Sequence, residues 1–453
     1  MLRHYAIICF ALCSSEVIAQ NSTSPTLSLT STPYSELHSQ TGETLPPVPI
    51  ERLSLKNAEL ALQYYNRDIL NARRAVEAAK ADIITAGQRP NPVASVSISK
   101  LQSKMGDGSW WNKTADTIIS ISQLIERGNK RELRTDAAQL RIQAAQLDLY
   151  DVERQQRLGL FGAYYDLLLM QEKYKIALGN VKFYETAVHA AELRLNAGDI
   201  SPTDLSRIRV DSLRAENDLQ QATNDRMNAQ LVLAYAIGQE GNARQIVLSD
   251  EWPAIRQAMS IEQLEQLLQQ RPDVRAAEMR VQASTKVREL ARSLRTRDVT
   301  VAAQYEHNPP DANNTVGLGI SIPLFINYNF SGEIQRAEVD YQTALEDTAR
   351  VRAKALAELS KNRNDLASSL ERVARYQTNL LSEARKAAKA AQFAYSQGAL
   401  DVTSLLDARR TLRAIEFDAA NAYADYAKSL AVWQVVQTYL PTTAPDADAA
   451  TQE

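Results

Sequence analysis

The chain has 453 residues, and its 51 Lys and Arg nearly balance 54 Asp and Glu, for a formal net charge of −3 at pH 7. This balance excludes the strong basic field of nucleic-acid-binding proteins, so no nucleic-acid partner is expected. With only 15 Gly, 15 Pro and 6% aromatic residues, the composition favours long helices that pack through small side chains rather than several ordinary domains. No run of 18 or more apolar residues occurs, so the sequence predicts no membrane-spanning helix.

Residues 1–19 have the pattern of a secretory signal peptide. Arg3 and His4 precede a short apolar run that ends at Cys13, and Ala19 is the expected cleavage site. Cleavage removes both cysteines of the chain, so neither a disulfide nor a thiolate metal site is expected. The residues before Cys13 are not the small ones that lipidation requires, and lipidation is not expected. Residues 20–50 are rich in Ser, Thr and Pro and are expected to form an extended or disordered leader.

Residues 51–245 are expected to form a first unit of helices and two alternating strands. The expected elements are a helix over 53–88, strands over 93–101 and 115–125, a very long helix over 130–197 and a helix over 204–236. The loop between the two strands carries Trp110 and Trp111. Paired tryptophans are typical of a membrane-interface belt, although aromatic residues packed on their own sheet would look the same.

Residues 246–259 are expected to be a linker, after which the same series begins again over 260–440. The expected elements are a helix over 260–295, strands over 299–307 and 315–325, a long helix over 333–397 and a helix over 405–439. Ser331 is the expected N-cap of the long helix, because its side-chain oxygen can accept a free backbone N–H. Residues 441–453 are low in complexity and are expected to be disordered.

The two series resemble each other residue by residue. The segment NAGDISPTDLSRIR at 196–209 aligns without a gap on SQGALDVTSLLDAR at 396–409, and SISQL aligns on SIPLF near the ends of the second strands. Asp68 and Ile69 align on Asp273 and Val274. The sequence therefore predicts an internal duplication, with helix, strand, strand, long helix, turn and helix occurring twice.

The strand predicted over 315–325 suggests where the sheet lies. Val316, Leu318, Ile320 and Ile322 alternate with Gly and Ser, so one face is aliphatic and the other small. A membrane barrel places aliphatic residues toward lipid and small or polar residues toward its lumen, but a buried strand of a soluble protein has the same pattern. Four strands cannot close a barrel, and an open edge is not tolerated in lipid. A membrane location would therefore need oligomerisation, and three copies would give a twelve-stranded barrel.

Over residues 51–440 the chain resembles the TolC-like outer-membrane efflux proteins. The resemblance is carried by the duplicated order, by RPDVRAAEMRV at 271–281, by SIPLFINYNFSGEIQRAE at 321–338 and by the two turns between long helices. ERGNKRELR at 126–134 makes the chain most similar to the heavy-metal efflux component of the cobalt-zinc-cadmium type, rather than to drug or protein-secretion components.

This resemblance implies a fold that is mainly α with a small membrane β part. It implies a homotrimer in the lipid of the Gram-negative outer membrane, where a twelve-stranded β-barrel continues as an α-helical barrel through the periplasm. It also implies two protein partners, a periplasmic adaptor of the membrane-fusion class and an inner-membrane pump of the resistance-nodulation-division class.

The two turns are predicted to be helical hairpins, with Gly198 and Gly398 ending one helix in the left-handed conformation and Ser201 or Thr203 capping the next. An ordinary turn between two helices would have the same residues. The resemblance implies that these turns are periplasmic tips that dock the adaptor through Gly198, Asp199, Ser201, Thr203, Gly398 and Thr403.

The resemblance further implies a periplasmic aperture at Asp407 and Ser404. Family members carry two acids there, so Ser404 departs from the pattern and only one carboxylate ring is expected, unless Asp407 is an ordinary solvated charge. A ring of charges at a constriction biases the passage of cations. Tyr395 and Asp204 fall on a hydrogen-bonded tip lock, whereas the arginine of a companion ion pair is replaced by Leu400. We therefore expect a lock with one hydrogen bond kept and one ion pair missing.

No catalytic or cofactor motif is visible in the sequence. The three histidines after the signal peptide, His38, His189 and His307, are too scattered for a metal triad. We therefore expect a transport protein rather than an enzyme, without cofactor. The leading hypothesis is the exit duct of a tripartite efflux pump for heavy-metal cations. The alternatives are a duct for drug efflux or type I protein secretion and, from another class, a periplasmic coiled-coil scaffold without a pore.

Overall fold

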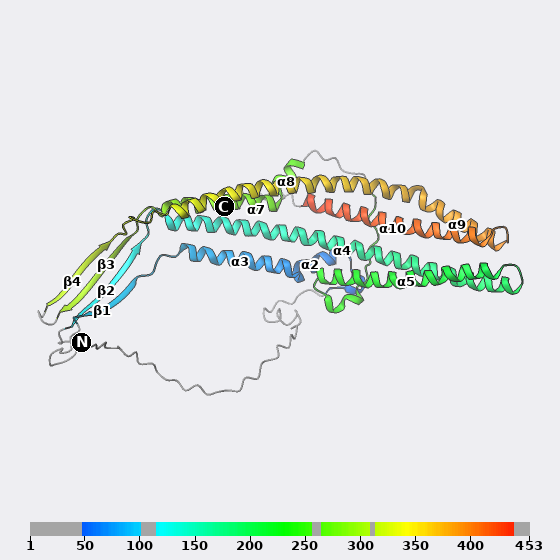
Figure 1. The fold of residues 1–453 in the computed structure, drawn as a ribbon, viewed down its shortest axis with the longest axis horizontal. Coiled ribbons are helices and arrows are strands. Elements are labelled where there is room, and N and C mark those ends of the chain that lie inside the picture. Colours follow the sequence, from blue (N-terminus) through cyan, green and yellow to red (C-terminus); the bar gives the residue numbers. More distant parts are fainter. Residues whose placement is uncertain (1–47, 101–114, 256–263, 309–312, 439–453) are drawn as a thin grey trace, which may run out of the picture. The chain divides into compact units, whose positions relative to one another are not determined.

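The computed structural model describes residues 48–100, 115–255, 264–308 and 313–438, shown in Figure 1. The expected signal peptide, nearly all of the leader, Trp110 and Trp111, part of the linker and the tail lie outside the described residues. The described residues belong to one compact unit, Pro47–Glu453. Within the described part of the chain helices predominate, and none carries an apolar stretch long enough to cross a membrane.

The helices and strands follow the predicted order. They are η1 (Ile50–Arg52), α2 (Leu55–Tyr65), α3 (Arg67–Gly87), β1 (Val93–Ser99), β2 (Asp116–Ile125), α4 (Lys130–Asn196), α5 (Pro202–Ala236), η3 (Glu240–Gln245), α6 (Leu264–Gln270), α7 (Pro272–Ser293), β3 (Val299–Asn308), β4 (Asn313–Ser321), α8 (Ser331–Arg375), the π-helical segment η5 (Tyr376–Leu380), α9 (Leu381–Ser396) and α10 (Val402–Thr438). Helix, strand pair, long helical shaft, turn and helix thus occur twice along the chain.

The first helix of each series is broken, and the prediction of one helix over 53–88 and one over 260–295 is wrong. Asn66 has an extended backbone, and its side-chain oxygen accepts the N–H groups of Asp68 and Ile69, both at 3.1 Å, which starts α3. Arg271 is also extended and is followed by Pro272 at the start of α7. The residue before a proline is disfavoured in a helix, so this second break has a sequence cause.

The second long helix also differs from its prediction. It begins at Ser331, and Phe330 in the left-handed region (φ 59°) is the residue before it, so Ser331 is not the N-cap. The side-chain oxygen of Asn329 accepts the N–H of Ser331 at 3.1 Å instead. The predicted helix over 333–397 is divided into α8 and α9 by η5, in which the wider π turn replaces α geometry.

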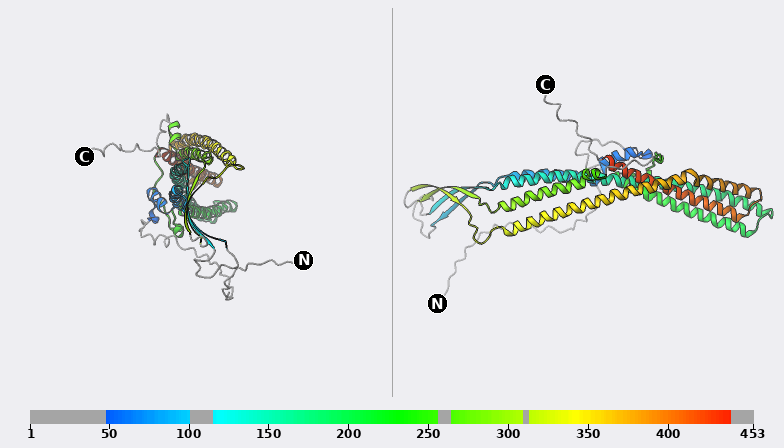
Figure 2. Two further views of the ribbon diagram at one scale, coloured as in Figure 1. Left: turned by 90° about the vertical axis from the view of Figure 1, so that its left-hand side faces the viewer. Right: turned by 90° about the horizontal axis from the view of Figure 1, so that it is seen from above.

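The four strands form one antiparallel sheet in the order β1-β2-β3-β4, and they lie side by side in Figures 1 and 2. Across the sheet, Val96 lies opposite Ile119, Ile119 opposite Tyr305, and Tyr305 opposite Val316. Residues directly opposite each other share a face of the sheet. One face therefore gathers mainly aliphatic side chains, and the other carries mainly Ser, Thr, Gly and Gln.

Strand β4 ends earlier than the predicted strand over 315–325. Val316, Leu318 and Ile320 lie within it, but Ile322 follows its last residue, Ser321, so the placement of Ile322 in the strand is wrong. Pro323 has no amide hydrogen to donate to a neighbouring strand, which stops the ladder at this point.

The long helix α4 connects the two ends of the helical part. Its 67 residues correspond to about 100 Å. It packs against α3 and α7 on the side of the sheet and against α5 and α10 further along (Figure 1). A buried cluster that we call the tip core joins the α4–α5 and α9–α10 hairpins near their turns. It comprises Val181, Tyr184, Ala191, Leu205, Ile208, Ala215, Tyr395, Val402, Leu405 and Leu406.

Candidate functional site at the helical tips

The two hairpin turns have the same backbone structure. Gly198 and Gly398 lie in the left-handed region, with φ of 80° and 72°. The N–H of Asp199 donates to the carbonyl of Arg194 at 2.9 Å, and the N–H of Gly198 donates to that of Leu195 at 3.0 Å. The turn at Gly398 repeats both hydrogen bonds at the aligned positions. This is the Schellman motif, and it confirms the predicted role of the two glycines as helix ends.

The helix after each turn is capped by a serine and an aspartate three residues apart, but the order of these two residues is reversed between the turns. Ser201 accepts the N–H of Asp204 at 3.1 Å and donates its hydroxyl to the Asp204 carboxylate at 2.8 Å, which confirms Ser201 as the N-cap of α5. In the second turn the acid stands first, and Asp401 accepts the N–H of Ser404 at 3.0 Å. Hydrogen bonding from the side chain and then the backbone of Ser404 lowers the pKa of Asp401. The sequence analysis missed this cap, although Asp is a favoured N-cap residue.

Polar contacts join the two hairpins along their length. They run from Arg194 Nη1 to Tyr395 O (3.1 Å), from Arg207 Nη1 to Thr403 Oγ1 (3.1 Å), from Arg410 Nη2 to both oxygens of Asp211 (2.7 and 2.8 Å) and from Arg413 Nη1 to Asp218 Oδ2 (2.6 Å). Only 3% of the Asp211 side chain is exposed, so this carboxylate depends on its arginine partners for compensation. The hydrogen bonds that Arg410 donates to the Asp211 carboxylate raise the pKa of Arg410.

The expected hydrogen bond between Tyr395 and Asp204 is not made within this chain. The buried phenol oxygen of Tyr395 has no hydrogen-bond partner among the described residues, and Asp204 is held by its own cap residue, Ser201. Arg194 lies over the Tyr395 ring instead, with its guanidinium carbon 4.8 Å from the ring centre. Sequence reasoning missed Arg194, because its partner lies on another hairpin about two hundred residues away.

Two predicted aperture residues lie on one exposed face of α10. Ser404 and Asp407 are both exposed and three residues apart, a spacing that places them on the same side of a helix. Leu405 and Leu406 between them are buried in the tip core. The predicted docking residues of the turns are also exposed: Gly198, Asp199, Ser201, Thr203, Gly398 and Thr403.

The aliphatic face of the sheet is open in the single chain. Val316, Leu318 and Ile320 are 79%, 86% and 72% exposed. On the other face the hydroxyls of Ser95 and Ser120 are 2.7 Å apart and hydrogen-bonded. A large exposed aliphatic surface of this kind marks a site of contact with lipid or protein.

Metal-binding side chains do not gather anywhere in the described ranges. No three His, Cys, Asp or Glu residues there are close enough to hold an ion. Of the two histidines in these ranges, His307 pairs with Asn314 at 2.7 Å within the sheet.

Comparison with known families identifies the fold. The family described as outer membrane efflux protein matches residues 59–239 and 263–432. The chain belongs to this family. It is 25% identical over 383 residues to the cobalt-zinc-cadmium resistance protein CzcC of Cupriavidus metallidurans, covering 84% of this chain and 89% of that protein. It is 24% identical over 379 residues to the pyoverdine export outer membrane protein OpmQ of Pseudomonas aeruginosa, covering 78% of each.

Solved structures of an outer membrane protein and of a transmembrane channel share the fold. VceC of Vibrio cholerae superposes with a TM-score of 0.68 at 19% identity, over 84% of this chain and 95% of that one. CusC superposes with a TM-score of 0.67 at 16% identity, over 84% and 91%. Relatives of this chain are efflux channels of the Gram-negative outer membrane that extend into the periplasm, which confirms the predicted location. They are transport proteins rather than enzymes.

Proposed function

We propose that three copies of this outer membrane efflux protein form the exit duct of a tripartite pump of the resistance-nodulation-division class. The open sheet carries the proposal. In the described chain β1 and β4 each have a strand on one side only, and the aliphatic face is exposed. Unpaired strand edges are not tolerated in lipid. Pairing β4 of one copy with β1 of the next closes a twelve-stranded barrel and removes every edge.

In this arrangement the aliphatic face is in contact with lipid and the Ser- and Gly-rich face lines the lumen. The long helices continue the barrel into the periplasm, and the two exposed turns dock a periplasmic adaptor. Asp407 from three copies forms one carboxylate ring at the aperture, beside a ring of Ser404. A single acidic ring favours cations over anions in the duct.

Heavy-metal cations are the substrate that we propose for the duct. The support is the similarity to a relative named as a cobalt-zinc-cadmium resistance protein, together with the acidic residue at the aperture. The competing substrate class is a larger organic molecule, supported by the relative named for pyoverdine export at nearly the same identity. Because the sequence identity to both relatives is low, the two substrate classes have to be distinguished by the sensitivity of a deletion strain to metal salts and to drugs.

Two measurements test the proposal. Fractionation of cells followed by gel electrophoresis with and without heating should show a heat-sensitive trimer in the outer membrane, and a soluble monomer would contradict the barrel and favour the scaffold alternative. Deletion of the protein should increase sensitivity to cobalt, zinc or cadmium salts. Increased sensitivity to drugs alone would contradict the metal assignment and leave the duct intact.

A further inference from the structure

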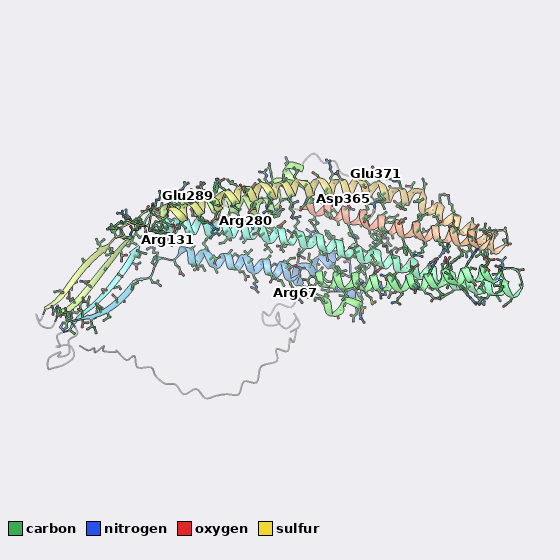
Figure 3. All side chains as sticks on the ribbon, in the orientation of Figure 1. Arg67, Arg131, Arg280, Glu289, Asp365 and Glu371 are labelled. Atoms are coloured by element: carbon green, nitrogen blue, oxygen red, sulfur yellow. The ribbon has the colours of Figure 1, made fainter. Side chains whose placement is uncertain are left out.

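A cavity lies where the helical part of the chain meets the sheet. It has a volume of about 750 Å³ and is lined by the loop between α3 and β1 (residues 89–92), the end of β2 (residues 123–125), the loop that follows it (residues 126–129) and the start of α4 (residues 130–132). Figure 3 shows Arg131 at this junction. The cavity is far along the chain from both tips and belongs to neither the proposed aperture nor the docking turns.

Some charged groups of the cavity are already neutralised. The Lys130 ammonium is buried and donates to the Asp298 carboxylate at 2.7 Å and to the carbonyl of Thr296 at 2.9 Å. Glu126 accepts two hydrogen bonds from Arg134, at 2.5 and 2.9 Å. These side chains are held in place and leave no charge for a ligand.

The remaining charge of the cavity is positive. Arg89, Arg127 and Arg131 line it, and their guanidinium groups make no hydrogen bond, ion pair or ring contact with any other described residue. The only lining carboxylate in the same situation within the described chain is Glu132. Three cations against one anion leave a net charge of about +2, to which the N-terminus of α4 adds partial positive charge. Guanidinium groups bind phosphate oxygens in a bidentate manner.

The surroundings of the cavity indicate a membrane boundary. Ile119, Ile121 and Ile125 lie on the aliphatic face of β2 and lead down to the cavity, and each is exposed. At the same end of the sheet, after β4, the rings of Phe325 and Tyr328 both pack edge-on against Phe330, with centres 5.1 and 5.0 Å from it. Aromatic and arginine side chains together are typical of the membrane–water interface.

We propose that this cavity binds the phosphate group of an anionic phospholipid in the periplasmic leaflet. The guanidinium groups of Arg89, Arg127 and Arg131 hold the phosphate, and the acyl chains lie along Ile119, Ile121 and Ile125. The exposed isoleucines of this face, which only Gln123 interrupts, select a lipid over a free anion, and the net positive charge selects an anionic headgroup over a zwitterionic one. This inference rests on the proposed membrane barrel, because only that orientation places the cavity at a leaflet.

The test uses the full-length protein in nanodiscs that contain either phosphatidylglycerol or phosphatidylcholine, with retained lipid counted by native mass spectrometry after gentle extraction. Each cation near an anionic lipid surface changes affinity about fivefold. We therefore expect the triple variant Arg89→Gln/Arg127→Gln/Arg131→Gln to lose phosphatidylglycerol affinity on the order of a hundredfold. Glu132→Gln, which removes the opposing charge, should raise the affinity about fivefold.

The control is the triple variant Arg275→Gln/Arg352→Gln/Arg363→Gln, which removes the same charge from exposed helical arginines that have no partner among the described residues. It should retain phosphatidylglycerol as the unmodified chain does.

Equal loss of phosphatidylglycerol in both triple variants, or equal retention of the two lipids by the unmodified chain, would overturn the proposed site. So would complete displacement of the lipid by inorganic phosphate, which would indicate a free-anion site. If the unmodified chain did not enter nanodiscs at all, the barrel itself would be wrong and the lipid site with it.

Discussion

The two helical hairpins end in the same turn but reach it through different shafts. In the first, α4 runs unbroken for 67 residues to the turn at Gly198. In the second, the π-helical segment Tyr376–Leu380 separates α8 from α9 before the turn at Gly398. At the level aligned with this segment, α4 contains Gly179, a weak helix former. The two turns thus share their backbone hydrogen bonds, whereas the shafts differ at the aligned level, where the first has a glycine and the second a π-helical segment.

The largest expected effect tests whether the two hairpins contribute equally to the stability of the tip core. Leu205 and Leu405 are aligned residues, and both are buried in the tip core. We expect Leu205→Ala and Leu405→Ala each to lower the free energy of unfolding by about 3 kcal/mol, because each leaves a cavity in packed surroundings. Thermal unfolding of the purified protein measures both. A difference of more than about 1.5 kcal/mol between them would show that one hairpin holds the core alone.

The next effect concerns the charged contacts between the hairpins. Arg410→Ala removes the cross-hairpin partner of the buried Asp211 carboxylate, and we expect a loss of about 2 kcal/mol, reduced because Arg410 is itself half exposed. Arg413→Ala breaks the pair with Asp218, whose carboxylate is far more exposed than that of Asp211, and should cost less than about 1 kcal/mol. Equal unfolding midpoints for the two variants would mean that burial of Asp211 has no role in joining the hairpins.

A smaller effect is expected from a substitution that changes only the first shaft, α4. Apart from the neighbouring backbone of α4, a Cβ at Gly179 would meet no atom of the described residues within 4 Å. Gly179→Ala should therefore stabilise α4 by roughly 1 kcal/mol, because alanine loses less conformational freedom in a helix. The unfolding temperature of the purified protein reports the change. A decrease would show instead that a neighbouring copy covers Gly179.

The smallest effect is a pH dependence at the second tip. The pKa of Asp401 is lower in the folded chain than the ordinary value of 3.8, mainly through hydrogen bonding to Ser404. A lowered folded pKa contributes stability that is present above the unfolded value and is lost as pH falls through the folded one. Below about pH 4, amide hydrogen exchange at residues 402–405, corrected for intrinsic rates, should accelerate more than exchange at 202–205. Replacing Asp401 with Asn should abolish this difference between the tips.

Local patterns sufficed to predict the elements and their order. Gly198 and Gly398 ended helices because only a left-handed residue closes a Schellman turn, and Ser201 capped α5 as its residue type suggests. The breaks were less visible. Pro272 indicated a break at Arg271, but Asn66 breaks its helix by accepting the first N–H groups of α3, and an asparagine can make such hydrogen bonds in other places.

The amino-acid sequence by itself determined the order of helices and strands, the alternation of the strands, the two turns and the family resemblance, because these depend on neighbours a few residues apart. Only the tertiary structure decided the contacts of the tips. Asp204 is held by Ser201 rather than Tyr395, and Asp211 is held by Arg410 from the other hairpin. The physical reason is that a carboxylate takes whichever donor the packed helices bring within hydrogen-bond distance. The sequence around either residue does not indicate a contact with a residue nearly two hundred positions away.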